Sequence, residues 1–429
     1  MHCTPSGRPP RLPPALRRPL SRVGLAVAAL ASFSLAQAAP ALSLPAQVGK
    51  MIFFDKSLSA SGQLACSSCH DPANHYAPSN ALAVQLGGPG MNLTGTRAVP
   101  TLTYKDYTPA YADLAPNPDG LSAPGPGGGF TWDGRVDTLA AQAQIPLLSP
   151  IEMANTSIHD VVTKLQGASY SALFKQAFGA GVFGDTGAAF SAALSALQAY
   201  QLEDSSFHPY TSKYDLYASN KVGGTLTAAE ARGLAIFNDP ARGNCASCHF
   251  SGAGANGSVA LFTDFSYEAI GVPRNTNDIK GNALVRGLPL SFDLGLCSRP
   301  DHPMPANAAY CGMFKTPTLR NVATRQVFFH NGQVKSLADA IDFYATRDTN
   351  PERWYPSVNG VAQKFNDLPA RYQGNIDRQM PLDGRAAGST PPLSPQDVAD
   401  LIAFLGTLTD GYVPPAATAA SLRTPPRTK

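Results

Sequence analysis

Two short cysteine motifs constrain this chain more than any other feature. They are Cys66-Ser-Ser-Cys69-His70 and Cys245-Ala-Ser-Cys248-His249. The pattern Cys-x-x-Cys-His attaches c-type haem: the two thiols add across the vinyl groups, and the histidine ligates the iron from the proximal side. A zinc ribbon or a thioredoxin-like redox pair also uses paired cysteines, but neither requires a histidine directly after both pairs. Two copies therefore predict a cytochrome with two covalently bound haem c groups.

The N-terminal segment has the pattern of an export signal. Five arginines and no acidic residue accompany an uncharged apolar run over 23–35, and Ala36-Gln-Ala38 follows as a cleavage site. We expect residues 1–38 to be a signal peptide that directs the protein to the periplasm. A membrane anchor is the alternative, although the run is short for a span of about 20 residues.

The charge balance argues against a nucleic-acid partner. The 429-residue chain has a formal net charge of +3, and loss of the five signal arginines leaves about −2. No basic stripe runs along the rest of the sequence, which a nucleic-acid interface would require.

The remaining cysteines form one pair. Of seven cysteines, Cys3 leaves with the signal and four hold haem, so Cys297 and Cys311 are left. In an oxidising compartment this predicts a disulfide, which contributes roughly 3 kcal/mol on the chain-entropy estimate. Two free buried thiols are the alternative.

A diverged internal repeat sets the domain organisation. Residues 44–53 precede the first haem motif, residues 226–237 precede the second, and each segment is typical of a short helix that leads into a haem loop. This predicts two cytochrome c-like domains, each built on its own haem. We place the N-terminal domain at 39–215 and the C-terminal domain at 216–412, followed by a flexible tail at 413–429.

Helical signals dominate the chain. We expect helices near 158–166, 169–178 and 186–203, and a last helix that begins after Ser394 with Asp397 in its first turn. Proline, glycine and asparagine fill much of the intervening sequence, and long β runs are absent. The predicted fold class is mainly α, with two haem domains packed against each other and long irregular loops.

Beyond the haem motifs, three further segments resemble the bacterial di-haem cytochrome c peroxidase family, which includes the MauG-type enzymes. They are Trp132-Asp-Gly-Arg135, Pro150-Ile-Glu152-Met153, and Phe314-Lys-Thr-Pro-Thr-Leu-Arg-Asn321 with Phe328-Phe-His-Asn-Gly332. The resemblance covers about residues 45–410. It implies that peroxide reacts at the N-terminal haem and that electrons pass through the C-terminal haem.

For the first haem, the resemblance implies His70 as the proximal iron ligand. Other peroxidases of the family carry a distal histidine on the following loop, in a Gly-His setting, but the matching stretch Gln85-Leu-Gly-Gly88 contains no histidine. This departure predicts an iron with an open side. His75 is the only nearby alternative ligand, and it follows His70 too closely to reach the opposite face.

Three residues match the family's catalytic positions. Glu152 and Gln142 match the distal-pocket carboxylate and amide, and Trp132 matches the tryptophan between the two haems. The carboxylate would move a proton between the peroxide oxygens, and burial would raise its pKa. A surface position for Glu152 and simple core packing for Trp132 are the alternatives.

For the second haem, the resemblance implies His249 as proximal ligand and a distal ligand on the helix after the His-Asn-Gly turn. The matching position is Tyr344, as in MauG-type enzymes, where other members have methionine. Core packing of Tyr344 is one alternative, and ligation by Met304, Met313 or Met380 is another. The family's interdomain calcium is in doubt here, because Ala98 replaces its asparagine ligand.

The resulting expectation is a periplasmic peroxidase that reduces hydrogen peroxide to water. The second haem and Trp132 would relay electrons or share the high-valent oxidation, and a small donor such as a cytochrome c or cupredoxin would supply electrons. One alternative is a MauG-like oxidase of a protein or organic substrate. Another is a di-haem cytochrome that only transfers electrons. A homodimer is left open.

Overall fold

A computed structural model describes residues 41–120, 122–255, 257–278, 292–299 and 308–415. The expected signal peptide lies outside these ranges, and so does the expected tail beyond residue 415. Within the described ranges, no helix has both the length and the apolar character that a membrane span needs.

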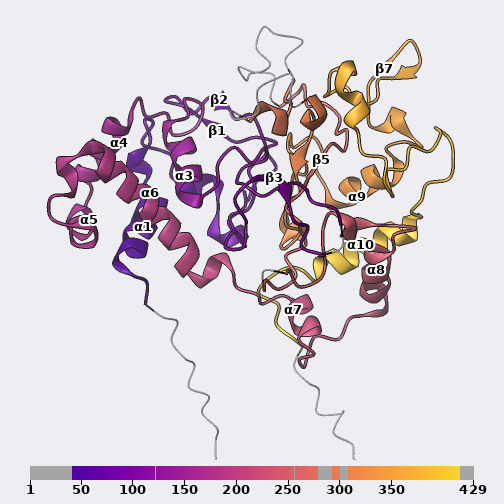
Figure 1. Ribbon diagram of the computed structural model, residues 1–429, viewed down its shortest axis with the longest axis horizontal. Coiled ribbons are helices and arrows are strands. Elements are labelled where there is room, and N and C mark those ends of the chain that lie inside the picture. The colour runs from indigo at the N-terminus through magenta and orange to yellow at the C-terminus, as the bar shows by residue number, and fades with distance from the viewer. Residues whose placement is uncertain (1–40, 121, 256, 279–291, 300–307, 416–429) are drawn as a thin grey trace, which may run out of the picture. The chain divides into compact units, whose positions relative to one another are not determined.

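Helices make up most of the regular structure, as the sequence predicts (Figure 1). They are α1 (Leu44–Phe54), α2 (Cys66–Cys69), α3 (Leu139–Leu148), α4 (Ile158–Gly167), α5 (Ser171–Phe178), α6 (Thr186–Glu203), α7 (Lys213–Ala218), α8 (Ala228–Asn238), α9 (Leu337–Thr346) and α10 (Pro395–Gly406).

Strands occur only as short antiparallel pairs in the part of the chain that the structure describes. The pairs are β1 (Leu86–Gly87) with β2 (Leu93–Thr94), β3 (Ala112–Ala115) with β4 (Gly125–Gly127), β5 (Tyr267–Glu268) with β6 (Phe314–Lys315), and β7 (Ser357–Val358) with β8 (Val361–Ala362).

The three predicted central helices are confirmed as α4, α5 and α6. α5 begins two residues after the expected start, and α4 ends one residue later than expected. The last helix, α10, begins as expected after Ser394, whose side chain accepts a hydrogen bond from the Asp397 backbone N–H. The Asp397 carboxylate in turn accepts from the Ser394 backbone N–H, which completes a capping box.

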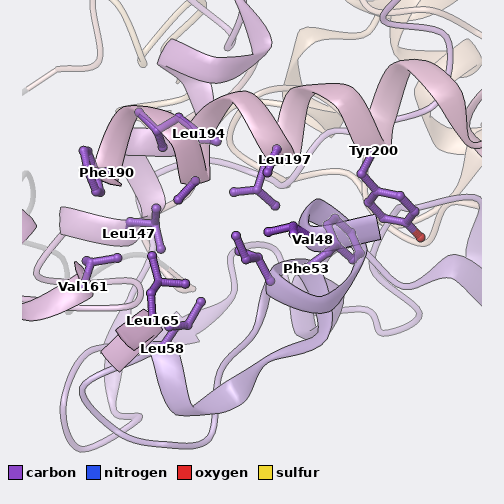
Figure 2. Close-up of a cluster of buried hydrophobic side chains, with 14 of the residues drawn as sticks. Val48, Phe53, Leu58, Leu147, Val161, Leu165, Phe190, Leu194, Leu197 and Tyr200 are labelled. Carbon is purple, nitrogen blue, oxygen red and sulfur yellow. The ribbon is translucent and has the colours of Figure 1, made fainter. Parts of the chain in front are cut away.

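The first hydrophobic core forms where α1 packs on α6. Val48 and Phe53 from α1 lie among Leu197 and Tyr200 from α6, and all four are buried (Figure 2). Close approach depends on Gly49, because a Cβ atom there would lie 1.9 Å from the carbonyl oxygen of Ala196. The helix before the first haem motif is therefore fixed at backbone contact.

The second hydrophobic core repeats this arrangement with α8 and α10. Phe237 from α8 and Phe404 from α10 pack edge to face, with ring centroids 5.2 Å apart. A Cβ atom on Gly233 would lie 2.0 Å from the carbonyl oxygen of Asp400. Gly49 and Gly233 occupy corresponding places in the two predicted repeat segments, so the structure supports the internal repeat.

The two repeats also exchange equivalent backbone hydrogen bonds. The Ala98 N–H donates to the carbonyl of His330 at 2.7 Å, and the Lys315 N–H donates to the carbonyl of Trp132 at 2.8 Å. Ala98 and Lys315 each lie two residues before a Pro-Thr-Leu segment. Trp132 and His330 each lie in a turn closed by a β-bridge, 130 to 136 and 328 to 334 respectively. We refer to this pair of hydrogen bonds as the reciprocal contact.

Side-chain contacts connect the repeats as well. The buried Tyr104 hydroxyl donates to Asp410 at 2.6 Å, and the Arg97 guanidinium pairs with Asp293 at 2.7 Å. The described residues from Ala41 onward cluster as one compact unit. The proposed boundary between residues 215 and 216 stays a prediction.

The predicted pairing of Cys297 with Cys311 is present as a disulfide. Both cysteines are buried in a third hydrophobic cluster, which also contains Phe343 and Tyr355. The disulfide therefore joins two buried positions before β6 inside the cluster that also contains Phe343 of α9.

Candidate haem and peroxide site

Both cysteine motifs fold into a tight turn that places the histidine at its end. The His70 N–H donates to the Cys66 carbonyl at 2.9 Å, and the His249 N–H donates to the Cys245 carbonyl at 2.8 Å. The four motif cysteines are half-buried and form no disulfide. Burial raises the pKa of each thiol, to about 12 for Cys66 and Cys245. Neutral thiols of this kind remain available for thioether bonds.

Both motif histidines are oriented by a backbone carbonyl. Nδ1 of His70 lies 3.1 Å from the carbonyl oxygen of Tyr76, and Nδ1 of His249 lies 3.0 Å from that of Phe262. Burial lowers the pKa of each imidazole to about 4, so both rings are neutral at physiological pH. A neutral ring that donates through Nδ1 leaves Nε2 free to ligate a metal.

The orienting carbonyls are themselves held by the two Pro-Thr-Leu segments. The Leu102 N–H donates to the Tyr76 carbonyl and the Leu319 N–H donates to the Phe262 carbonyl, each at 3.2 Å. Thr101 and Thr318 donate to the residues just before these carbonyls, each at 2.6 Å. The sequence analysis missed this support, although Pro-Thr-Leu occurs at both 100–102 and 317–319.

A cavity of about 210 Å³ opens beside the second motif. Cys245, Cys248 and His249 line it, and Tyr344 from α9 lines it as well. Burial raises the pKa of Tyr344, so an anionic phenolate there needs a nearby positive charge such as an iron ion.

The alternative ligands of the second motif are distributed differently. Met380 also lines the cavity, whereas Met313 is not among its lining residues. Met304 lies outside the described residues. Tyr344 and Met380 are thus the two candidates that the structure brings to the motif.

Trp132 lines the same cavity and is fixed at both ends. Its indole Nε1–H donates to the Ala98 carbonyl at 2.7 Å, and its own carbonyl accepts from the Lys315 N–H. His75 also lines this cavity, in a left-handed conformation with φ of 52°. His75 is thus placed beside the second motif.

Glu152 lies beside the first motif, at the end of the turn that follows α3. The pKa of Cys69 is raised to about 11 by burial and, secondly, by the negative charge of Glu152, which places that carboxylate near the motif. Burial also raises the pKa of Glu152, although its side chain remains accessible to solvent. The carboxyl group therefore has many neighbouring atoms but is not sealed in the core.

The loop that lacks the distal histidine packs directly on Glu152. The Gly88 N–H donates to the Glu152 carbonyl at 2.8 Å, and a Cβ atom on Gly87 would lie 2.4 Å from the Ile151 carbonyl oxygen. Gln142, half-buried on α3, makes no side-chain hydrogen bond to Glu152 within the described structure. The structure thus places Glu152 beside the first motif. Gln142 is connected to Glu152 only by the chain, since it lies on α3 and Glu152 lies in the turn that follows α3.

Comparison with known proteins places these features in one family. The sequence profile of the di-haem cytochrome c peroxidase family matches residues 45–223. The chain is 34% identical to the methylamine utilization protein MauG of Paracoccus denitrificans over 398 residues, covering 90% of this chain and 94% of the relative. This chain belongs to the di-haem cytochrome c peroxidase family.

Further relatives agree with this assignment. The crystal structure of the diheme peroxidase BthA from Burkholderia thailandensis superposes with a TM-score of 0.75 at 37% identity, covering 86% of each chain. A cytochrome c551 peroxidase of Nitrosomonas europaea is 27% identical, covering 82% of this chain and 87% of the relative. As a member of this family, the chain is a di-haem oxidoreductase with two haem c groups.

The residues present fit the two haem c groups of this family. Each motif offers two unpaired thiols and a neutral imidazole, and the second motif adjoins a cavity that Tyr344 also lines. The fit is poorer for the interdomain calcium, because the Ala98 carbonyl is engaged by Trp132 and the neighbouring Arg97 pairs with Asp133 and Asp293. Calcium stays a prediction.

Proposed function

We propose that this protein is an exported periplasmic enzyme that reduces hydrogen peroxide to water at a haem held by Cys66, Cys69 and His70. The observation that carries the proposal is the Glu152 carboxyl group, which adjoins this motif with a pKa raised by burial. The bound haem iron supplies the site where peroxide binds and the route by which electrons reach it.

The chain's own residues manage the protons. Reduction of one hydrogen peroxide consumes two electrons and two protons and yields two waters. Ionised Glu152 would accept the proton of one peroxide oxygen and return it to the other as the O–O bond breaks, so that this oxygen leaves as water. The two electrons and two protons would convert the remaining oxygen into the second water. The Gln142 amide, one helix turn after the start of α3, orients the peroxide from the same side.

Trp132 would carry electrons between the two haem sites. It lines the cavity of His249 and is held rigidly by hydrogen bonds at both its indole and its backbone, which favours stepwise transfer through a fixed ring. Tyr344 would hold the second haem iron, and a hard anionic ligand of this type stabilises oxidised iron. A small periplasmic cytochrome c or cupredoxin is the electron donor, and a homodimer remains compatible with this scheme.

A MauG-like oxidation of a protein or organic substrate is the second candidate. Tyr344 and the 34% identity to a methylamine utilization protein MauG favour it. The residues just before the second haem motif, Arg242-Gly243-Asn244, oppose it, because MauG uses a surface tryptophan there to oxidise its protein substrate.

One experiment tests the proposal. One equivalent of hydrogen peroxide is added to the fully oxidised protein with both haems bound, and the visible and near-infrared spectra are followed together with peroxide loss. Rapid reaction of the oxidised protein, followed by turnover with a reduced cytochrome c, supports the peroxidase. A rapid reaction without turnover favours the oxidase. No reaction until one haem is reduced would mean that a distal ligand blocks the first iron.

A further inference from the structure

Three cationic side chains lie together on the wall of the 210 Å³ cavity. They are Lys105, Lys315 and Arg325, and each is half-buried. Lys105 comes from the loop after Thr103, Lys315 from β6, and Arg325 from the turn after Val322–Thr324. Segments distant in the sequence thus bring three positive charges to one place beside Trp132.

These cations differ from the other buried basic side chains. Arg97 and Arg347 each pair with a buried aspartate, and Arg320 pairs with the half-buried Asp215. Among the residues that the structure describes, no carboxylate lies within ion-pairing distance of Lys105, Lys315 or Arg325. The Lys315 ammonium donates to the Gly129 carbonyl, and the Arg325 guanidinium donates to the carbonyls of Val99 and Val327 at 3.1 and 3.3 Å.

The protein environment alone disfavours the charges of this group. Burial, followed by the charge of Arg325, lowers the pKa of Lys105 to about 8. Burial, followed by the charge of Lys105, lowers the pKa of Lys315 to about 7. Clustered buried cations without an ion-pairing anion are costly, so a negatively charged occupant of the cavity would stabilise them.

The same wall includes the segment that supports the first haem motif. Pro100 and Thr101, beside the carbonyl partner of His70, line the cavity together with the three cations, and the Arg325 guanidinium donates to the adjacent Val99 carbonyl at 3.1 Å. His249 and Tyr344 line the same cavity. The group therefore adjoins the second motif and the segment that holds the first.

We propose that Lys105, Lys315 and Arg325 form a shared anion site that binds propionate carboxylates of both haems. The inference rests on the proposed function, in which both motifs hold haem. Propionates are the only anionic groups that a haem carries. Positive charges near both irons favour the reduced state and raise both midpoint potentials.

The test replaces one cation at a time. The variants K105M, K315M and R325M are prepared with two haems bound, and the midpoint potentials of both haems are measured by spectroelectrochemistry without peroxide. We expect both midpoints to shift to more negative potential in K105M and R325M, and K315R to retain the wild-type values. The control is K364M, since Lys364 is a half-buried lysine that pairs with Asp348.

Two results would overturn the inference. Unchanged midpoint potentials in all three variants with full haem content would contradict the anion site. A shift in the midpoint potential of only one haem would show that the two haems do not share the site. If a variant fails to fold, infrared difference spectra of the wild-type protein, with the haem propionates isotopically labelled, give an independent answer. Ionised carboxylate bands are expected, and protonated carboxyl bands at neutral pH would contradict the ion pairs. None of these readouts depends on peroxide turnover, so failure of the peroxidase proposal is recognised separately.

Discussion

Glu152 shows how one side chain can meet two opposed requirements. A proton carrier must exchange protons with a substrate, so it needs access to an open space, and it must also hold a proton more readily than an ordinary glutamate. The position of Glu152 beside the first haem motif meets both conditions, because burial raises its pKa while the side chain remains accessible. At the scale of single residues, the degree of burial of a carboxyl group thus determines its pKa and its access to a substrate.

Replacement of Glu152 by glutamine should remove the proton transfer while preserving shape. We expect peroxide turnover to fall by about 10²–10⁴-fold with two haems still bound, the usual contribution of a positioned acid–base group. Steady-state peroxide consumption measures the change. E352Q is the control, because Glu352 is exposed and lies in the short turn Pro351–Arg353. Turnover of E152Q near that of E352Q would remove Glu152 from the mechanism.

The same carboxyl group predicts the direction of the pH dependence. Glu152 accepts the first proton only when ionised, so turnover should rise with pH through its pKa. Burial raises this pKa, and the acid limb of the profile should therefore lie above the usual range of glutamate. A pH profile of turnover locates the limb. Its persistence in E152Q would assign it to another group.

Tyr344 gives a prediction about the second haem. Exchange of a hard anionic ligand for a thioether favours reduced iron, so Y344M should raise the midpoint potential of that haem. Spectroelectrochemical titration measures it. Y214F serves as control, since the Tyr214 hydroxyl donates to the Ser251 carbonyl and does not line the cavity. An unchanged potential in Y344M would favour Met380 as the ligand.

Individual residues were predictable from sequence only where a motif identified them. The motif spacing indicates His70 and His249, and the family resemblance indicates Glu152. The three cavity cations have no such signal, because a lysine or arginine in a loop is indistinguishable from a surface residue until the chain folds. The carbonyl of Tyr76 is similarly hidden, since it depends on a left-handed backbone with φ of 56°.

At the scale of elements, α1 and α8 depend on a glycine in contact with a neighbouring helix. G49A should destabilise the protein by about 1–3 kcal/mol, because a methyl group there would overlap the Ala196 carbonyl oxygen and force the helices apart. Denaturant unfolding measures the loss. G167A at the end of α4 is the control, since no atom lies within 4 Å of its added methyl group. Equal stability of the two variants would show that α1 and α6 can separate freely.

The helices were largely predictable, and the reason is local. Ser394 with Asp397 and Thr227 with Glu230 form capping boxes that depend on four consecutive residues, so the sequence is sufficient to place α8 and α10. The strand pairs were not predictable, because β5 and β6 join segments nearly fifty positions apart and each strand has only two residues. Their pairing depends on the loops around the cavity.

At the scale of the whole molecule, the buried Asp410 carboxylate connects the segment after α10 to segments far away in the sequence. It accepts hydrogen bonds from the Tyr104 hydroxyl at 2.6 Å, the Asn321 amide at 2.8 Å and the Thr211 backbone N–H at 2.9 Å. D410A should cost more than Y104F, because it leaves several buried donors unsatisfied at about 1–3 kcal/mol each.

Calorimetry or denaturant unfolding of the two variants tests this connection. The expected order of stability is wild type, then Y104F, then D410A. We also expect the unfolding transition of D410A to broaden or to divide into two, because the two repeats lose the carboxylate that connects them. A loss in Y104F as large as that in D410A would mean that Tyr104 packing, rather than the carboxylate, holds the two regions together.

The reciprocal contact has a consequence for assembly. When a segment of one repeat binds a segment of the other and the equivalent segments bind in return, the arrangement is that of an isologous dimer, here contained within a single polypeptide. The stretch between α7 and α8 then acts as a tether that replaces bimolecular association by an intramolecular one. Because the two repeats are similar, each repeat presents a surface that a second copy of the same repeat would also fit. Such a pairing competes with the contact between the two different repeats. The tether therefore selects the partner: it ensures that the repeat with the first haem motif meets the repeat with the second haem motif.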